Sequence, residues 1–403
     1  MNSHVLQPLN KAHRIVSLDL LRGVAVLGIL IMNIQSFSMP SAAYINPTAY
    51  GDLNGLNKWV WILSNLLASS KFMSIFSMLF GAGVLLFTKR AEQKGLNSAA
   101  LHYRRMAWLF LFGLLHGFLL WAGDILVNYS LCGMLLFLFR SMQPTKLLRT
   151  ALAFFFVPIL INLFFAGSIP YWSPDVLQST MESWVPGEQI MQHHLDVYRS
   201  GWIKQMELRI PEAIFMQTGL FVMGTFWRVM AMMLLGMALY KWQVLSAGRS
   251  SLFYTKMILF GLIIGLLLSG TGILLNFKYQ WAMEFSMFLG VQFNYLGSVG
   301  TALAYVGIVM LISQSPRFKG FIYLLSAVGR MAFTNYILMT LLATFIFYGH
   351  GLGLYGSVER RYQVSLCLGI WVLLLCISPL WLKRFPFGPL ERLWRGLTYW
   401  NWK

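Results

Sequence analysis

A histidine and an aspartate eight positions apart are the side chains of this sequence best suited to proton transfer. His116 lies deep in an apolar segment, and Asp124 stands at the turn into the next one. Histidine is the usual general base of enzymes, and a carboxylate can orient it. Eight residues of straight helix would place Asp124 about 12 Å from His116, too far for direct contact, although Gly123 can break the helix and shorten that distance. The alternative is that His116 is a core histidine whose hydrogen bonds are satisfied within the protein, and that Asp124 caps a helix.

Four polar residues share one face of the apolar segment 16–38, because each helical residue turns by about 100°. They are Asp19, Arg22, Asn33 and Ser36. Asp19 and Arg22 are three positions apart and can pair. This face is either a polar track toward a reaction chamber, or an ion pair together with an interhelical hydrogen bond from Asn33.

Three further cations fall within apolar runs, where a charge costs about 2.5–3.5 kcal/mol at a helix centre. Lys71 either extends its ammonium to the membrane surface or serves as the partner of a buried acid. Arg228 lies near mid-membrane, too far from an end for such an extension. Arg330 lies close to the cytoplasmic entry of the segment 322–348, five residues before the polar Asn335. It can reach the membrane surface or bind an anionic cofactor.

These side chains belong to a chain whose composition is that of a membrane protein. Of its 403 residues, 58% are hydrophobic and 11% are charged, whereas soluble domains are about 25% charged. Soluble globular domains and disorder are therefore excluded. The net charge of +18 does not indicate nucleic acid, because no polar basic domain carries it. The partner that the composition implies is the lipid bilayer.

The apolar segments predict an all-α, polytopic membrane helix bundle. A spanning helix needs about 20 apolar residues, and about ten segments qualify: 16–38, 59–87, 104–122, 125–140, 147–166, 220–240, 255–275, 285–312, 322–348 and 363–382. With alternating sides, 21 of the 31 Lys and Arg residues lie on the side of the N-terminus, 7 lie on the other side and 3 lie within apolar runs. This bias predicts that both termini are cytoplasmic.

The predicted organisation is a single membrane domain over residues 1–403. It comprises an N-terminal five-helix half (15–166), an extracytoplasmic loop (167–213), and a C-terminal five-helix half with a cytoplasmic tail (214–403). Steps of three and four between apolar residues from Met191 to Met206 predict an amphipathic helix in the loop, which would lie on the outer face at about 188–210 as a lid or as an interfacial helix. His193 and Asp196 share a face of this helix, but no third ligand is evident, so we predict no metal site.

Seven motifs together resemble the YeiB-like family of bacterial inner-membrane proteins, whose C-terminal half is a domain of unknown function. The motifs lie at 17–23 with Asn33, 71–72, 79–83, 116–117, 123–126, 329–336 and 388–395. The resemblance runs from about residue 15 to 400. It implies a multi-pass protein of the bacterial inner membrane, in a family sometimes described as a possible transport family.

The motif from Ser17 to Gly23 also resembles a wider group of transmembrane acyltransferases, over about one helix. The group includes bacterial polysaccharide O-acyltransferases and the lysosomal heparan glucosaminide N-acetyltransferase, and it moves acyl groups from cytoplasmic acyl-CoA to acceptors across the membrane. This chain departs from the group at two positions. Asn33 stands where the O-acyltransferases have histidine, and Tyr44 stands where the lysosomal type has it.

The resemblance leads to a specific hypothesis with acyl-CoA as a co-substrate and no permanently bound cofactor. Arg22 and Arg330 would meet the CoA phosphates, His116 would be the general base, Asp124 would orient it, and Asn33 would stabilise the oxyanion. The acceptor would be an extracytoplasmic glycan or small molecule. Two alternatives stay open: a transporter that uses Asp124, Arg228 and Lys71 as its route, and a non-catalytic membrane scaffold.

Overall fold

The computed structural model describes residues 15–400, which form helices joined by turns and, within that range, no strand. Lys11, Arg14 and Lys403, which entered the charge count above, lie outside the described residues. In chain order the helices are α1 (Val16–Ser38), α2 (Ser41–Ile45), α3 (Gly55–Leu67), α4 (Lys71–Gln93), α5 (Ser98–Leu119), α6 (Leu126–Leu136), α7 (Pro144–Ser168), α8 (Pro174–Trp184), α9 (Glu188–Tyr198), α10 (Met206–Gln217), α11 (Phe226–Lys241), α12 (Ser251–Lys278), α13 (Met283–Phe285), α14 (Val291–Gln314), α15 (Lys319–Arg330), α16 (Ala332–Phe347), α17 (Arg360–Arg384) and α18 (Pro389–Tyr399).

The all-α membrane bundle is confirmed, and each predicted apolar segment lies in helices. Within the described range, seven helical segments are long and apolar enough to cross a membrane, and the bent pair Pro316–Arg330 and Ala332–Phe347, which turns through 79°, makes an eighth. The other two predicted spans correspond to α5 and α6. Helix α5 carries two arginines in its first half, and the apolar stretch Leu126–Phe139 is short for a span.

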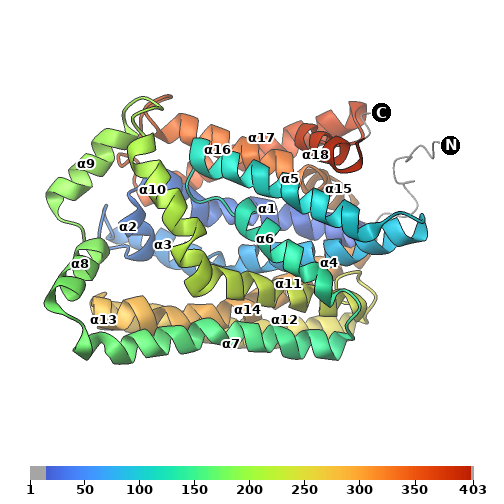
Figure 1. The fold of residues 1–403 in the computed structure, drawn as a ribbon, viewed down its shortest axis with the longest axis horizontal. Helices are drawn as coiled ribbons and strands as arrows, with labels where there is room; N and C mark the ends of the chain where they lie inside the picture. The colour runs from blue at the N-terminus through green and yellow to red at the C-terminus, as the bar shows by residue number, and fades with distance from the viewer. Residues whose placement is uncertain (1–14, 401–403) are drawn as a thin grey trace.

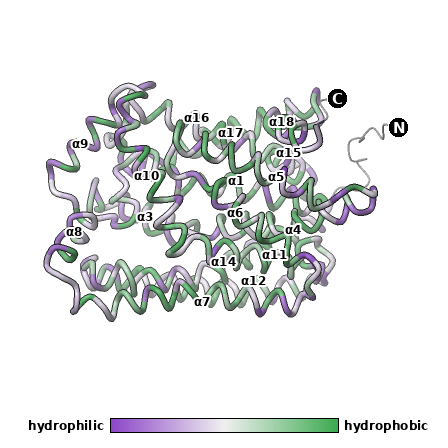
Figure 2. Tube along the Cα trace, viewed as in Figure 1, coloured by the Kyte–Doolittle hydropathy of each residue, from purple (hydrophilic) through white to green (hydrophobic). Residues whose placement is uncertain are grey.

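Most of the helices run along the long axis of the molecule (Figure 1). The start of α1 and helix α18 lie at one end, and α8 and α9 lie at the other. Hydrophobic residues predominate along the bundle, and hydrophilic residues gather toward its two ends (Figure 2). Of the most apolar stretch of α1, 78% is buried inside the protein, against 11% for α7 and 22% for α12. Helix α1 is therefore central, whereas α7 and α12 lie at the periphery with most of their surface outside the protein.

The predicted amphipathic lid helix is shorter than expected. It was expected to continue to about residue 210, but α9 ends at Tyr198 and a non-helical turn precedes α10. Tyr198 stacks on Tyr355 with ring centroids 4.7 Å apart, and its carbonyl accepts a hydrogen bond from the Gly349 N–H at 2.9 Å. These contacts hold the end of α9 against the connection between α16 and α17.

A close backbone contact in the core joins α1 to α15 through two glycines. A Cβ added to Gly329 would lie 1.9 Å from the carbonyl oxygen of Asp19, and one added to Gly23 would lie 2.0 Å from that of Leu325. No side chain fits at either position without moving a backbone. Helix α15 therefore packs directly on the backbone of α1, and Met331 then turns the chain into α16.

We expect Gly329→Ala to lower the stability of the protein by about 1–3 kcal/mol, because the added methyl group must push α15 away from α1. Gly320, on the same helix, has open space where its Cβ would be. Gly320→Ala should therefore leave stability unchanged or raise it slightly. Thermal unfolding in detergent compares the two variants, and equal unfolding temperatures would contradict this account of the α1–α15 contact.

Candidate functional site

His116 and Asp124 are in direct contact, which corrects the 12 Å separation expected for a straight helix. The His116 Nδ1 lies 2.7 Å from the Asp124 Oδ1. The contact forms because α5 ends at Leu119 and the chain reverses before α6 begins at Leu126. Both side chains are buried, at 3% and 1% exposure, so the pair is shielded from competing hydrogen bonds with solvent.

Further hydrogen bonds fix the roles of the two residues. The other Asp124 oxygen, Oδ2, accepts the N–H of Val127 at 2.9 Å, which satisfies the first turn of α6. When Asp124 is ionised and His116 is neutral, the imidazole carries its proton on Nδ1, because a carboxylate only accepts hydrogen bonds. The His116 Nε2 is then an acceptor, and it lies 3.0 Å from the Thr340 Oγ1. The predicted helix-capping role and the predicted histidine-orienting contact are thus both present in Asp124.

The surroundings of this pair are aromatic. The Tyr336 ring lies 5.0 Å from the His116 ring, and the Trp121 ring lies 6.2 Å from it. A Cβ on Gly117 would lie 2.5 Å from the Gln217 Nε2 and 3.3 Å from the Asp124 Cβ. The amide of Gln217 therefore lies beside the pair on a third element, α10, a neighbour that its sequence position did not suggest.

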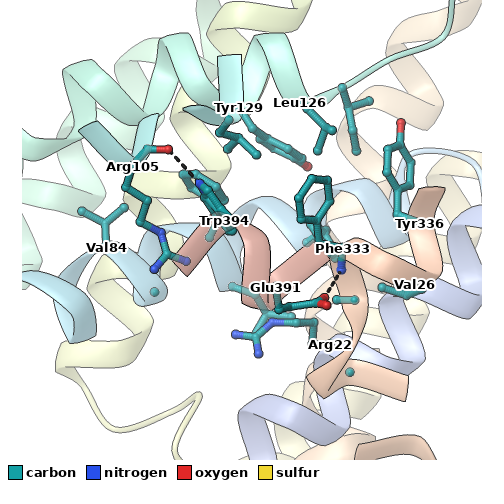
Figure 3. A pocket seen from close by; sticks show the side chains of 18 of the residues that line it. Arg22, Val26, Val84, Arg105, Leu126, Tyr129, Phe333, Tyr336, Glu391 and Trp394 are labelled. Carbon is teal, nitrogen blue, oxygen red and sulfur yellow. Dashed lines mark hydrogen bonds between the residues drawn. The ribbon is translucent and has the colours of Figure 1, made fainter. Parts of the chain in front are cut away.

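A cavity of about 230 Å³ approaches the pair from the end of the bundle that carries α18. Its walls are mostly aliphatic and aromatic, and its charged lining residues, Arg22, Arg105, Arg330 and Glu391, define what we call its mouth. Glu391 and Arg22 lie together across the cavity from Leu126 and Tyr129 (Figure 3). Tyr336 also lines the cavity. The inner wall of the cavity is therefore one side chain away from His116.

The two arginines predicted to bind an anion both line this cavity. Arg22 forms the predicted ion pair with Asp19, with 3.1 Å between Nη1 and Oδ1, and its side chain remains 30% exposed. The Arg330 Nη2 donates to the carbonyl of Pro386 at 3.3 Å. The glycine contact between α1 and α15 brings these two residues, 308 positions apart, to one opening.

Three further residues of the mouth were not predicted. Arg105 packs 4.0 Å from the centre of the Trp394 ring, and the Trp394 Nε1 donates to the Arg105 carbonyl at 2.9 Å. Glu391 accepts the N–H groups of Phe333 and Thr334 at 2.8 and 3.1 Å, which caps the N-terminus of α16. Helix α18, which belongs to the predicted cytoplasmic tail, forms one side of the cavity through Glu391 and Trp394.

The charge balance at the mouth favours an anion. Burial raises the pKa of the Glu391 carboxyl above its usual range, although hydrogen bonds from Thr334 and Phe333 oppose that rise. Three arginines, Arg22, Arg105 and Arg330, surround this single carboxylate and the Asp19 that pairs with Arg22. The mouth is therefore cationic at neutral pH.

Asn33 continues the face of α1 that lines the cavity. Val26 and Ile29 line it, and the helical repeat carries the same face on to Asn33 and Phe37. Phe37 packs on Trp121 with ring centroids 4.2 Å apart. Asn33 is half-buried, and no hydrogen bond links it to the histidine–aspartate pair. Its oxyanion role stays a prediction.

Lys71 and Arg228 form a separate buried group. Lys71 is fully buried and donates to Asn294 Oδ1 at 2.6 Å, so its predicted extension to the membrane surface is wrong. Arg228 donates to the hydroxyls of Ser74 and Ser298 at 3.0 and 2.8 Å. Within residues 15–400 neither cation forms an ion pair, so Lys71 has no acid partner.

The remaining predicted residue, Asn335, has a structural role. Its Nδ2 donates to the carbonyl of Val328 and to the Ser378 hydroxyl, each at 3.0 Å. These bonds brace the bend between α15 and α16 against α17. As for metals, the described part of the chain holds no group of three His, Cys, Asp or Glu side chains placed to bind an ion.

Comparison with known proteins finds relatives along the whole chain. A family model described as "Protein of unknown function (DUF418)" matches residues 239–401. The chain is 33% identical to the uncharacterized protein YxaH of Bacillus subtilis, covering 99% of this chain and 97% of the relative. It is 32% identical to the uncharacterized protein YeiB of Escherichia coli, covering 96% of each. No solved structure matches.

We expect Asp124→Ala to destabilise the protein by about 1.5–3 kcal/mol, because it removes a charged acceptor from His116 and from the α6 N-terminus. In a double-mutant cycle with His116→Ala, the two changes should be non-additive by about 0.5–3 kcal/mol. Asp196→Ala is the control, because Asp196 is exposed and bonds only Gln192. Additive effects of the two buried substitutions would show that the pair is not energetically coupled.

Proposed function

The chain belongs to the YeiB-like family, and we propose that it is an inner-membrane acyltransferase that takes its acyl group from acyl-CoA and passes it to an extracytoplasmic acceptor. One observation carries the proposal. A cavity with a cationic mouth and apolar walls ends at Tyr336, whose ring lies against the histidine of a hydrogen-bonded histidine–aspartate pair. The mouth suits phosphates, the walls suit an acyl chain, and the pair suits proton transfer.

The donor class follows from the distribution of charge along the cavity. Arginine binds phosphate oxygens in a bidentate geometry, and the mouth offers Arg22, Arg105 and Arg330. Beyond them the walls consist of side chains such as Phe76, Leu79 and Leu109, which favour a hydrocarbon chain. Acyl-CoA combines phosphates with an acyl chain in one molecule. The nucleotide would remain at the surface, because the cavity is too small to enclose it.

The membrane orientation of the proposal follows from the basic residues. Helix termini rich in lysine and arginine face the cytoplasm, and the mouth lies at the end of the bundle where α18 and the start of α1 are found. We therefore place the mouth and both termini on the cytoplasmic side. Acyl-CoA is then supplied on the side where the cavity opens.

The acceptor would approach His116 from the opposite end. The carbonyl of Leu119, three residues after His116, accepts hydrogen bonds from Trp202 Nε1 and Arg209 Nη1, each at 2.8 Å. The segment joining α9 to α10 thus covers the end of α5. We propose that this segment, within the predicted lid, controls entry of a glycan or small-molecule acceptor.

His116 would act as the general base of the transfer. With Nδ1–H held by Asp124, its Nε2, which lies 3.0 Å from the Thr340 hydroxyl, can take a proton from an attacking hydroxyl or amine. The nucleophile adds to the thioester carbonyl, the C–S bond breaks, and the proton passes from His116 to the CoA thiolate. A general base at such a step accelerates it by about 10²–10⁴-fold.

No observation favours the transport alternative in the same way. Its proposed route used Asp124, Arg228 and Lys71 in sequence, yet Asp124 is held by His116 and Val127, whereas the two cations bond to Asn294, Ser74 and Ser298. A scaffold would need the paired polar groups but not the cavity. Acyl transfer uses both.

We expect purified protein in detergent to bind octanoyl-CoA in calorimetry, and the double variant Arg22→Ala, Arg330→Ala to bind it at least about a hundredfold more weakly, because each charge-assisted hydrogen bond contributes about 1.5–3 kcal/mol. Exposed Arg317, in the turn before α15, gives the control Arg317→Ala. Octanoate and phosphatidic acid serve as competing ligands. Equal or tighter binding of either would identify the cavity as a site for a lipid anion and contradict the CoA assignment.

We expect His116→Ala to retain octanoyl-CoA binding and to lose thiol release from octanoyl-CoA by about 10²–10⁴-fold, because only the proton acceptor is removed. The assay uses proteoliposomes, with water as the acceptor. His193→Ala, at an exposed position of α9, is the matched histidine control. Undiminished thiol release by His116→Ala would exclude His116 as the base, and no release by the wild-type protein would contradict acyl transfer.

A further inference from the structure

The geometry points to Thr340 as a nucleophile that receives the acyl group before the acceptor does, so we propose that transfer proceeds through an acyl–Thr340 ester. The inference rests on the proposed acyltransferase function and adds a covalent step to it. Its basis is that Thr340, His116 and Asp124 form a continuous hydrogen-bonded series of hydroxyl, imidazole and carboxylate.

The distances of the series are those of an activated hydroxyl. Asp124 Oδ1 lies 2.7 Å from His116 Nδ1, and His116 Nε2 lies 3.0 Å from Thr340 Oγ1. A nucleophile within hydrogen-bond reach of a base, itself oriented by a third group, is the arrangement that generates covalent intermediates. When Nδ1 carries the only imidazole proton, the Thr340 hydroxyl donates toward Nε2 in place of its bond to the Tyr336 carbonyl.

The hydroxyl of Thr340 bonds a helix carbonyl as that of Thr344 does, but it also has the His116 imidazole as a second partner. A buried helical threonine ordinarily donates to a carbonyl of the preceding turn. Thr344, also buried, does so with the Leu341 carbonyl at 3.3 Å. Thr340 has the Tyr336 carbonyl at the same 3.3 Å, but His116 Nε2 is closer. The side chain thus has a backbone partner available and still contacts the imidazole.

Thr340 lies beside the inner wall of the donor cavity. Tyr336 and Met339, which precede it on α16, both line that cavity. Tyr336 is four residues earlier and so shares a helix face with Thr340. An acyl chain that extends past Tyr336 would bring its thioester toward the Thr340 hydroxyl. That path requires rotation of the Tyr336 ring, because Thr340 is 1% exposed.

The step balances without any further reactant. In the first half, Thr340 Oγ1 attacks the thioester carbonyl, its proton moves to His116 Nε2, the C–S bond breaks, and the thiolate leaves with that proton as CoA thiol. In the second half, the acceptor hydroxyl or amine attacks the Thr340 ester. Its proton moves to His116 Nε2, and then to Thr340 Oγ1 as the ester C–O bond breaks.

A covalent carrier explains how two substrates from opposite sides use one base. The cavity opens at the end that carries α18, whereas α10 and the preceding turn cover the other end. With an ester on Thr340, CoA leaves before the acceptor enters. The donor and the acceptor then need not occupy the buried site together.

The test is isotope exchange and adduct mapping on the full-length protein in detergent. Wild-type protein should exchange labelled CoA into octanoyl-CoA without an acceptor, and should carry one octanoyl ester on the peptide that contains Thr340. Thr340→Val should lose both signals and keep octanoyl-CoA binding, and its thiol release should fall to the His116→Ala level, because the residues act as a unit. Thr340→Ser should keep exchange, and the control Thr344→Val should keep both signals.

The outcomes separate this inference from the acyltransferase assignment. If the wild-type protein releases thiol, and Thr340→Val releases thiol and exchanges CoA equally well, Thr340 is not the nucleophile while acyl transfer stands. An octanoyl adduct on His116 instead of Thr340 would also overturn the inference. If the wild-type protein neither binds octanoyl-CoA nor releases thiol, both assignments fall together.

Discussion

The backbone contact between α1 and α15 at Gly23 and Gly329 is the constraint on which the rest of the site depends. Because neither glycine has a Cβ, the Asp19 carbonyl oxygen approaches the backbone of Gly329 directly. The contact sets Arg22 beside Arg330 at the cavity mouth. It also fixes where α15 ends, and therefore where the bent partner α16 starts and which of its faces meets His116.

Because the chain bends after α15, the N-terminus of α16 needs hydrogen-bond acceptors, and helix α18 near the end of the chain supplies one. A helix that begins inside the bundle leaves N–H groups without partners. Glu391 accepts two of these from α16, and Asn335 ties the bend to Val328 and Ser378. The carboxylate that caps α16 thereby also lines the cavity beside the arginines of its mouth. Through Glu391, helix α18 therefore contributes both to the bend between α15 and α16 and to the charge at the cavity mouth.

The other buried charges, Lys71 and Arg228, are also hydrogen-bonded within the protein, but to a different kind of partner. Lys71 and Arg228 have neutral partners on α4, α14 and the end of α3, and no carboxylate. Two like charges in this setting raise the electrostatic cost of the fold, and hydrogen bonds to oxygen dipoles offset part of it. They join α4, α11 and α14 into one unit behind the cavity, which fits a role in support rather than in a pathway.

The parts of the site that were predictable from sequence are local. The apolar segments predict helices because hydrophobicity over about 20 residues is sufficient for a span, and the Asp19–Arg22 pair follows from a spacing of three. The His116–Asp124 contact was expected only on the acyltransferase hypothesis, because it depends on a chain reversal after Leu119 that residue spacing does not determine. Arg105 entered the sequence analysis only through the count of Lys and Arg residues. Its place in the mouth depends on Trp394 of α18, almost 290 residues later.

The position of Thr340 shows why a buried histidine in a membrane need not be only structural. A neutral imidazole has one donor and one acceptor, and both nitrogens of His116 have partners, so it is the chemistry of those partners that favours more than a structural role. Here the acceptor nitrogen is bonded by a hydroxyl that has its own helix carbonyl within reach. The nucleophile, its base and the carboxylate come from three elements, α16, α5 and the turn before α6. Helix α16 starts at the cavity mouth, and α5 ends beneath the turn before α10. The arrangement therefore connects the two ends of the bundle at one proton-accepting atom, His116 Nε2.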